Sequence, residues 1–365
     1  MKNSFGNQIT VTIFGESHGN GIGVVMDGLA PGIKVDEAFI RGQLSKRRPA
    51  GKISTARREQ DEYTIESGVF NGYTTGTPVC IVIPNTAQHS KDYSATRSKA
   101  RPGHADYTAY CKYHGYEDYR GGGHFSGRIT AGLVAAGGLL IPALEKKGIR
   151  IATHMSRCAG IDDRGFEVLQ ADIDQLNQQD FPVLSARSAA DMKAVIEAAA
   201  AEGDSVGGIL ETVITGLPAG LGEPWFDTVE GLLSHGLFSI PAVKGVSFGD
   251  GFALADQRGS VANDPFRYEN GQAVTAKNSN GGINGGITNG MPLLIRTVIK
   301  PTPSIYQEQE TIDFIKKEET TLQIAGRHDP CIVHRARVVV DSICAMVVAD
   351  LLTGRFGTDY LGGEE

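Results

Sequence analysis

Apolar and polar residues alternate in several short segments of the chain and follow a helical period in others. Alternating segments rich in β-branched residues predict strands at residues 8–14, 21–27, 63–70, 77–84, 208–216, 243–249 and 291–300. Apolar residues at helical spacing predict helices at residues 35–48, 126–147, 189–202 and 335–352. The strands and helices come in mixed order, without a regular βαβ rhythm. This order predicts an α+β fold and not a doubly wound parallel sheet.

Glycine and basic residues are concentrated in a few segments. The 47 glycines include clusters at residues 15–23, 121–127 and 281–290, and clustered glycine lets a backbone come close to a ligand. Residues 41–58 hold seven basic side chains and no acidic one, although the chain has a net charge of −7. This basic segment is either a solvated face or a local anion site. The glycine and basic clusters are spread along most of the chain, and a boundary between two independent domains would separate them. We therefore expect one domain over residues 1–365.

The composition disfavours several classes of protein. A net acidic charge argues against a general nucleic-acid-binding surface. The five cysteines are far apart and form no C-x-x-C motif, and the histidines show no H-x-x-x-H spacing, so neither disulfides nor a metal site are expected. The polar N-terminus has no signal-peptide pattern, and the apolar stretch at residues 132–144 is short and interrupted by glycine. We therefore expect a cytoplasmic protein without a membrane span.

Residues 14–19 read Phe-Gly-Glu-Ser-His-Gly and contain two candidate catalytic side chains, Ser17 and His18. The G-x-S-x-G pattern is that of a hydrolase nucleophile elbow, which needs a strand, a sharp turn and then a helix. Here glycine-rich residues 19–23 and a second predicted strand follow, and a helix could start there only at a large entropic cost. The pattern therefore disfavours a serine hydrolase. A glycine-rich hairpin with an incidental serine and histidine is the simplest local interpretation.

Two further segments combine a stiff loop with basic side chains. Pro102 and Gly103 restrict the loop that carries His104, beside Arg101. Residues 119–128 place a triple glycine before the longest predicted helix, where backbone N–H groups can bind an anion. Each segment also has a plain interpretation, as an exposed loop or as a helix cap.

Two segments near the C-terminus have the same ambiguity. Residues 300–304 form a proline-rich turn with one cation and two hydroxyl groups. Asp329 precedes Pro330 and is held in an extended conformation, where its carboxylate could act as a base or cap the following helix.

Taken together, these segments resemble the chorismate synthase family. The matching segments occur in the order of the family, at residues 14–19, 101–108, 119–123, 222–224, 242–245, 281–286, 300–304 and 327–331. They extend over essentially the whole chain. The resemblance implies a β-α-β sandwich, in which two antiparallel sheets enclose a helical layer, assembled as a homotetramer.

The resemblance also implies a reaction. The family is a group of lyases that convert 5-enolpyruvylshikimate 3-phosphate to chorismate and phosphate by anti-1,4-elimination, in the shikimate pathway of aromatic amino acid biosynthesis. It requires reduced FMN, although the reaction has no net redox change, and it is associated with NADP. Nothing in the chain resembles an added flavin reductase domain. We therefore expect a monofunctional enzyme that receives reduced FMN from an external source.

Individual residues match positions with known roles in the family. His18 matches the histidine that protonates the departing phosphate, and His104 matches the histidine that faces the flavin. Asp329 matches the aspartate that assists deprotonation of flavin N5, which in turn takes the substrate C6 hydrogen. Substrate anions are expected at Arg47, Arg48, Arg101 and Arg128. Flavin contacts are expected at His124, Phe125, Ser126, Ala242, Gly285, Lys300, Pro301, Thr302, Pro303, Ser304 and Arg327.

Three positions depart from a pattern that many members share. His124 stands in place of an arginine, so a phosphate contact there becomes pH-dependent. Pro241 stands in place of an asparagine and removes a backbone N–H and a side-chain amide. Lys52 stands where arginine is frequent. Two alternatives to the flavin-dependent lyase remain, a serine hydrolase that uses Ser17 and a non-catalytic protein that binds flavin or another phosphorylated ligand.

Overall fold

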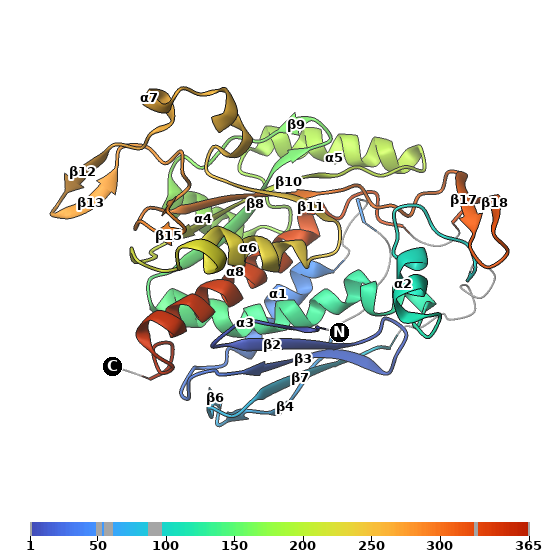
Figure 1. Ribbon diagram of the computed structural model, residues 1–365, viewed down its shortest axis with the longest axis horizontal. Helices are drawn as coiled ribbons and strands as arrows, with labels where there is room; N and C mark the ends of the chain where they lie inside the picture. Colours follow the sequence, from blue (N-terminus) through green and yellow to red (C-terminus); the bar gives the residue numbers. More distant parts are fainter. Residues whose placement is uncertain (1, 49–52, 55–60, 87–96, 325–327, 364–365) are drawn as a thin grey trace.

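Two five-stranded antiparallel sheets form the framework of the molecule (Figure 1). The computed structural model describes residues 2–48, 53–54, 61–86, 97–324 and 328–363. The first sheet has the order β1-β2-β3-β7-β4, with strands β1 (Ser4–Phe5), β2 (Thr10–Gly15), β3 (Gly21–Asp27), β4 (Thr64–Ser67) and β7 (Val79–Pro84). The second has the order β11-β16-β10-β8-β9, with strands β8 (Arg150–Cys158), β9 (Ile161–Asp162), β10 (Gly208–Thr215), β11 (Val243–Phe248) and β16 (Leu293–Ile299).

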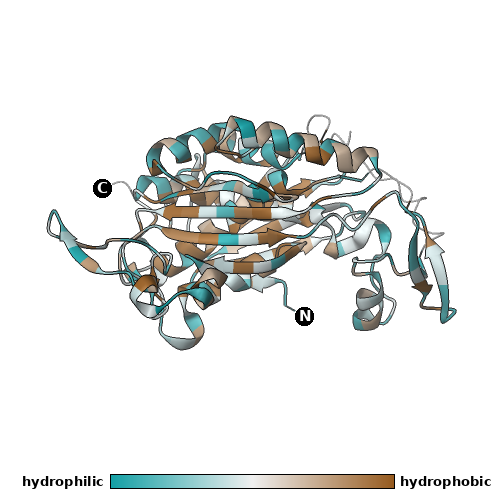
Figure 2. Cartoon of the chain, turned by 90° about the horizontal axis from the view of Figure 1, so that it is seen from above, coloured by the Kyte–Doolittle hydropathy of each residue, from teal (hydrophilic) through white to brown (hydrophobic). Residues whose placement is uncertain are grey.

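Helices lie between the two sheets (Figure 1). These helices are α1 (Glu37–Arg47), α3 (Thr130–Lys146), α6 (Val229–Phe238) and α8 (Val333–Phe356). Helix α3 packs on β3 and β7, whereas α8 packs on β8 and β10. On the far side of the second sheet, α4 (Leu169–Gln178) contacts β8 and α5 (Ala186–Ala201) contacts β9. The strands of this sheet are largely hydrophobic, with hydrophilic positions in between (Figure 2).

Small residues allow the central helices to pack closely. Almost every residue of α3 is buried. A Cβ at Gly137 would overlap Ser342 of α8, and a Cβ at Gly138 would come within 3.1 Å of Ile40 of α1. The glycines therefore set the spacing of α3 from both neighbouring helices. Because α1, α3 and α8 are held in this way, the end of α1, the start of α8 and the segment before α3 have fixed positions. The candidates Arg47, Arg128 and Asp329 lie at or next to these positions.

Shorter elements complete the described structure. The helices are α2 (Asp106–Tyr113) and α7 (Gly259–Ala262), with 3-10 turns at Arg120–Phe125, Gly127–Ile129, Trp225–Asp227 and Gly251–Asp256. Four two-stranded hairpins pair β5 (Val69–Phe70) with β6 (Tyr73–Thr74), β12 (Phe266–Glu269) with β13 (Gln272–Thr275), β14 (Ile283–Asn284) with β15 (Ile287–Thr288), and β17 (Gln309–Asp313) with β18 (Glu318–Leu322).

The mixed α and β content predicted from the sequence is confirmed, and the predicted long elements are present. The Asp36 side chain caps α1 by accepting a hydrogen bond from the Phe39 amide at 2.9 Å, as its position before the helix predicted. The patterns missed β8, in which Thr153 and His154 are fully buried, and α4. Two buried polar residues in succession break the alternation of polar and apolar positions that identifies a strand.

The helix predicted at residues 126–147 includes a segment with the length and composition of a membrane span. Gly127–Lys146 contains 20 residues and is long and apolar enough to cross a membrane by length and composition. In the structure, 89% of its most apolar window is buried within the protein. It is therefore a core helix, packed between β3, β7 and α8.

Candidate active site

The connection between β2 and β3 carries Ser17 and His18 into the interior, where they are 4% and 6% exposed. β3 begins at Gly21, so no helix follows Ser17 and the geometry of a nucleophile elbow is absent. Gly121 has a φ of 59° and lies against the His18 imidazole, with which a Cβ would overlap. The Ser17 amide donates a 3.1 Å hydrogen bond to the carbonyl of Gly123. The triple glycine thus forms the wall that holds His18.

The segment before α3 is attached to the same loop by side chains. The Nδ1 atom of His124 donates to the carbonyl oxygen of Gly15 at 2.7 Å, which fixes the tautomer of this ring. Arg120 binds both carboxylate oxygens of Asp118, at 2.7 and 2.8 Å. These hydrogen bonds lower the pKa of Asp118, and the nearby His18 lowers it further. Asp118 was not predicted, although the Asp-x-Arg spacing at residues 118–120 could have indicated an ion pair.

A buried carboxylate joins two of the four arginines expected to bind substrate anions. Asp61 accepts from Arg47 at 2.8 Å with one oxygen and from Arg128 with the other. Burial would raise the pKa of Asp61, but the two guanidinium groups outweigh it, and the net shift is downward. Burial lowers the pKa of Arg47, against the attraction of Asp61. Arg48 is half-buried and follows Arg47 at the end of α1. The sequence offered no signal for Asp61.

Asn85 connects this arginine pair to the His18 loop. Its side-chain oxygen accepts from Arg128 Nε at 3.0 Å. Its amide nitrogen donates to the carbonyl oxygens of Glu16 and Gly19, each at 2.9 Å. The loop that carries His18 and the Arg47–Arg128 pair are thus joined by hydrogen bonds through Asn85.

Arg335 holds Asp329 next to Arg47. No sequence motif indicated Arg335. Arg335 Nη1 lies 2.6 Å from Asp329 Oδ2, and Arg335 Nε donates to the carbonyl oxygen of Arg47 at 2.8 Å. Both residues of the ion pair are mostly buried. The last turn of α1 and the start of α8 therefore position the candidate base. Arg327, expected to contact flavin, lies outside the described residues.

His104 lies in a second cluster. Its Nε2 atom is 2.8 Å from Ser304 Oγ. Arg101, expected to bind substrate, donates two hydrogen bonds to the Asp106 carboxylate, at 2.8 and 2.7 Å. Burial, followed by the positive charge of Arg101, lowers the pKa of His104 to about 4, and Lys300 adds to this effect while Asp106 opposes it. The ring is therefore neutral near pH 7, unless an anionic ligand binds next to it.

This depressed pKa predicts that stability depends on pH. The pKa of His104 falls from its usual 6.5 to about 4 on folding. As the pH is lowered, His104 therefore binds a proton in the unfolded chain at a higher pH than in the folded chain. The free energy of unfolding should therefore fall as the pH falls through this window, and His104→Gln should remove that part of the dependence. Urea titrations at several pH values measure it, with His235→Gln at an exposed site as the matched control. An unchanged pH dependence in the His104 variant would contradict the assignment.

The proline turn at residues 300–304 packs on the His104 loop. Lys300 Nζ donates to the Gly103 carbonyl oxygen at 2.6 Å, and the Lys300 amide donates to Ala242 at 2.9 Å. A Cβ at Gly103, whose φ is 72°, would come within 2.8 Å of Pro303. The Thr302 hydroxyl oxygen is buried and has no hydrogen-bond partner among the described residues. This cluster therefore offers a cation, an unused hydroxyl group and a neutral imidazole to a ligand.

The remaining candidates differ in position. Ser126 accepts from the Arg128 amide at 3.3 Å, and Phe125 is 42% exposed and packs edge-on against Tyr113 of α2. Gly285 lies in the turn between β14 and β15, at the opposite end of the molecule from α2 and His104 (Figure 1). Among the described residues, no three His, Cys, Asp or Glu side chains form a group that could hold a metal ion.

Comparisons with known proteins identify the family of this chain. The family model described as chorismate synthase matches residues 9–353. The chain belongs to the chorismate synthase family. It is 46% identical to the chorismate synthase of Thermococcus gammatolerans over 351 residues, which cover 96% of this chain and 97% of that protein. It is 47% identical to the Dehalococcoides mccartyi chorismate synthase over 353 residues, 96% of each chain.

A solved structure described as a crystal structure of chorismate synthase has the same fold. It superposes with a TM-score of 0.77 at 26% identity, covering 97% of this chain and 94% of the other. Membership of the chorismate synthase family indicates a lyase of the shikimate pathway, in aromatic amino acid biosynthesis, that acts on a small-molecule substrate. The family generally uses a reduced flavin.

Proposed function

We propose that this protein converts 5-enolpyruvylshikimate 3-phosphate to chorismate and phosphate by anti-1,4-elimination, as a monofunctional carbon–oxygen lyase. The observation that supports this most directly is the link, through Asn85, between buried His18 and the Arg47–Arg128 pair. A phosphate ester needs cations that bind it and a proton donor at its leaving oxygen, and this unit provides both. A serine hydrolase is not supported, because Ser17 lies in a strand-to-strand loop.

In this proposal the arginines bind and His18 transfers a proton. Arg128 and Arg47 are fixed by Asp61, so their guanidinium groups are oriented before the substrate arrives. His18 is held against Gly121 and donates a proton to the departing phosphate. Asp118 lies close enough for the charges of the two groups to interact, and it stabilises the protonated imidazole. Arg48 and Arg101 extend the positive surface toward the substrate carboxylates.

The second cluster fits a flavin phosphate and an electron-rich ring, and we propose that it holds reduced FMN. When bound, the reduced flavin would supply electron density for the elimination. Lys300 and the unpaired Thr302 hydroxyl suit an anionic group. His104 would hold the flavin from this cluster, and an anion there would favour its protonated form. Asp329, positioned by Arg335 beside Arg47, would hold or release a proton from its carboxylate.

The contacts proposed for His124 and for Ala242 are limited by the geometry of this chain. His124 already uses Nδ1 on the Gly15 carbonyl, so Nε2 is the ring nitrogen left for a flavin phosphate. Ala242 has a φ of 76° after Pro241, and its carbonyl oxygen accepts from the Lys300 amide. We propose that NADP does not bind to this chain itself but serves the external supply of reduced FMN.

We further propose a single domain of the β-α-β sandwich type, a cytoplasmic location and a homotetramer. One continuous hydrophobic core, from Ile9 to Leu361, supports the single domain, and five free cysteines agree with a reducing compartment. Gly285 precedes β15 and His104 precedes α2, and these two elements lie at opposite ends of the molecule (Figure 1), so we propose that a second copy supplies the flavin contact at Gly285. No contact with nucleic acid or a membrane is part of the proposal.

An anaerobic assay tests the function. Purified protein with reduced FMN and 5-enolpyruvylshikimate 3-phosphate should form chorismate and phosphate in equal amounts, whereas oxidised FMN should give no product. Tight FMN binding without turnover would support a non-catalytic flavin protein. Hydrolysis of an ester substrate that is lost with Ser17→Ala would support the hydrolase.

Exposed aromatic residues predict where the copies associate. Trp225, Phe226 and Phe252 are 85%, 96% and 87% exposed. Because large exposed apolar side chains mark interaction sites, Trp225→Arg with Phe226→Arg should lower the molar mass of the assembly. Light scattering after size-exclusion chromatography measures it against the 38.8 kDa chain. Tyr116→Arg, at a 93% exposed aromatic residue, is the matched control. An unchanged mass in the double variant would place the interface elsewhere.

A further inference from the structure

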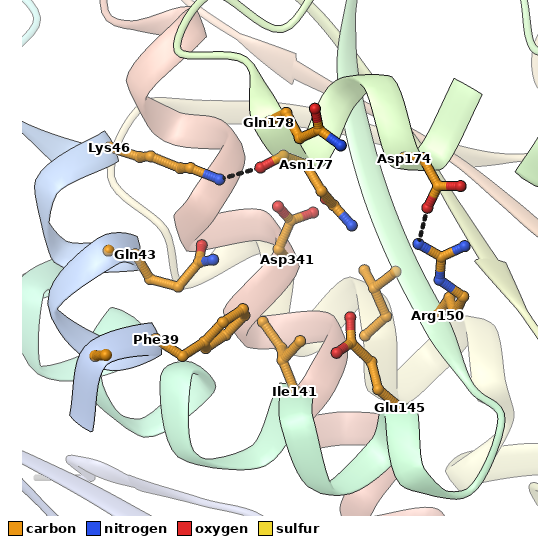
Figure 3. Close-up of a pocket in the computed structure, with 13 residues that line it drawn as sticks. Phe39, Gln43, Lys46, Ile141, Glu145, Arg150, Asp174, Asn177, Gln178 and Asp341 are labelled. Atoms are coloured by element: carbon orange, nitrogen blue, oxygen red, sulfur yellow. Dashed lines mark hydrogen bonds and ion pairs between the residues drawn. The ribbon is translucent and has the colours of Figure 1, made fainter. Parts of the chain in front are cut away.

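Lys46 belongs to the basic segment at residues 41–58, but its side chain contacts a different part of the fold from the substrate arginines. Arg47, the next residue of α1, binds Asp61 at 2.8 Å, whereas Lys46 extends to the last turn of α4 (Figure 3). The Nζ atom of Lys46 donates to the carbonyl oxygen of Asn177 at 2.5 Å. The end of α1 therefore presents one cation to the candidate substrate site and another to α4.

The hydrogen bond of Lys46 crosses a gap in the packing. Helix α1 packs directly on α3 and α8. Between α1 and α4, in contrast, lies a cavity of about 420 Å³, which is lined by Phe39 and Gln43 of α1 and by Asn177 and Gln178 of α4 (Figure 3). Because side chains do not fill this space, the position of the α1 end relative to α4 depends more on the hydrogen bond than on packing.

The end of α4 receives its cations from other helices. The last carbonyl groups of a helix have no partner within the helix and carry partial negative charge. The sequence of α4 places no basic residue in its last turn. Arg337 of α8, which is 1% exposed, donates to the carbonyl oxygens of Leu176 and Gln179 at 2.8 and 2.9 Å. Lys46 and Arg337 thus attach α1 and α8 to the same helix end.

The charged groups around Lys46 determine when it is protonated. Burial, followed by the positive charge of Arg337, lowers the pKa of Lys46 to about 8. The carboxylates of Asp341 and Asp180 act in the opposite direction. The remaining charged groups that line the cavity lie on its opposite side, and they are Glu145, Arg150 and Asp174 (Figure 3). The ammonium group of Lys46 is therefore mostly charged at neutral pH and loses its proton in mildly alkaline solution.

We propose that Lys46 is a positioning residue for substrate binding, because its ammonium group holds the last turn of α1 at the end of α4 and so keeps Arg47 in place. This inference rests on the proposed function, since it takes Arg47 as an anion-binding residue. Asp61 holds the Arg47 side chain, Arg335 donates to its carbonyl oxygen at 2.8 Å, and Lys46 adds an attachment to a further helix. Without this attachment only part of the molecules would have the α1 end in its binding position, and the apparent affinity for substrate would fall by that fraction.

The pH dependence of substrate affinity tests this inference in the wild-type protein. Hydrogen bonds from charged donors are about twice as strong as those from neutral ones, so the attachment weakens when Lys46 loses its proton. The dissociation constant of 5-enolpyruvylshikimate 3-phosphate, measured by calorimetry, should rise about fivefold from about pH 7 to about pH 9, through the pKa of Lys46. Lys46→Arg should bind equally well over this range, because a guanidinium group keeps its proton.

Lys46→Met removes the charge and keeps the length of the side chain. It should bind the substrate about tenfold more weakly at neutral pH, with a raised KM and an unchanged kcat, because the contact of His18 with Gly121 involves neither α1 nor α4. Lys146→Met is the matched control, at an exposed lysine that does not line the cavity, and it should behave like the wild type. The inference is wrong if Lys46→Met binds like the wild type or if Lys46→Arg keeps the wild-type pH dependence.

Amide hydrogen exchange separates this inference from the proposed function, because it needs no substrate. In Lys46→Met the amides of residues 44–48 should exchange about tenfold faster than in the wild type, whereas Lys46→Arg and Lys146→Met should match the wild type. A long-range effect of the lost charge on the substrate would weaken binding without changing exchange, so unchanged exchange in Lys46→Met would overturn the inference. If the wild type binds no 5-enolpyruvylshikimate 3-phosphate at any pH, the proposed function fails, and the exchange measurement still decides whether Lys46 positions α1.

Discussion

His18→Ala should lower kcat by about 10²–10⁴-fold, the range for loss of a general acid. His18 is buried, held against Gly121 and linked to the arginine pair through the loop that Asn85 binds, so no other described side chain occupies its place. Single-turnover measurements under anaerobic conditions with reduced FMN measure the chemical step apart from product release. The pH dependence of kcat should also lose the limb that belongs to the acid.

Ser17→Ala is the matched control, because Ser17 is equally buried and lies next to His18. Its backbone amide makes the bond to Gly123, and alanine keeps this amide, so most activity should remain. Equal losses in the two variants would contradict the assignment of His18 as the proton donor. Binding of reduced FMN, measured separately, should be unchanged in both.

Asp61→Ala should reduce the free energy of unfolding by about 3–5 kcal/mol, the usual cost of removing one member of a buried ion pair. Asp61 is 5% exposed and bonds both Arg47 and Arg128, so its loss leaves two guanidinium groups in the interior without their shared counter-ion. Urea unfolding at neutral pH measures this change. Because substrate anions supply the missing charge, the substrate should raise the midpoint of unfolding more in this variant than in the wild type.

Glu37→Gln is the control for this prediction. The Glu37–Arg41 pair has a comparable 3.0 Å contact, but its side chains are 53% and 57% exposed. Exposed pairs at this spacing contribute only about 0.3–0.5 kcal/mol, so the control should change stability little. If Asp61→Ala behaves like the control, Asp61 is not the residue that organises the arginine pair.

Several elements could be predicted from local patterns because their causes are local. Asp36 caps α1 through a bond to Phe39, three residues away, and the period of apolar residues predicted α8. The catalytic candidates could be selected because short motifs around His18, His104 and Asp329 resemble those of a known family. Their individual motifs did not decide between a catalytic role and an ordinary loop.

The partners of those residues could not be predicted in the same way. Arg335 lies 288 positions from Arg47 and stands in no motif that suggests the contact. Ser304 was selected from its own segment, but its contact with His104, 200 positions away, could not be predicted. Asp61 and Asn85 are isolated polar residues whose importance comes from burial, which one sequence does not show. β8 was missed for the same reason, since buried His154 bonds Asp163 and Glu211 and is polar at an interior position.

The sequence by itself determined the family, the α+β character and the residues that carry the proposed chemistry, because these depend on short motifs and on the period of apolar residues along the chain. Only the tertiary structure decided that Asp61 joins Arg47 to Arg128, that the pKa of His104 is depressed, and that Arg335 holds Asp329 beside Arg47. The physical reason is that burial and electrostatic interactions depend on distances through space. Folding sets these distances between residues that are far apart in the chain.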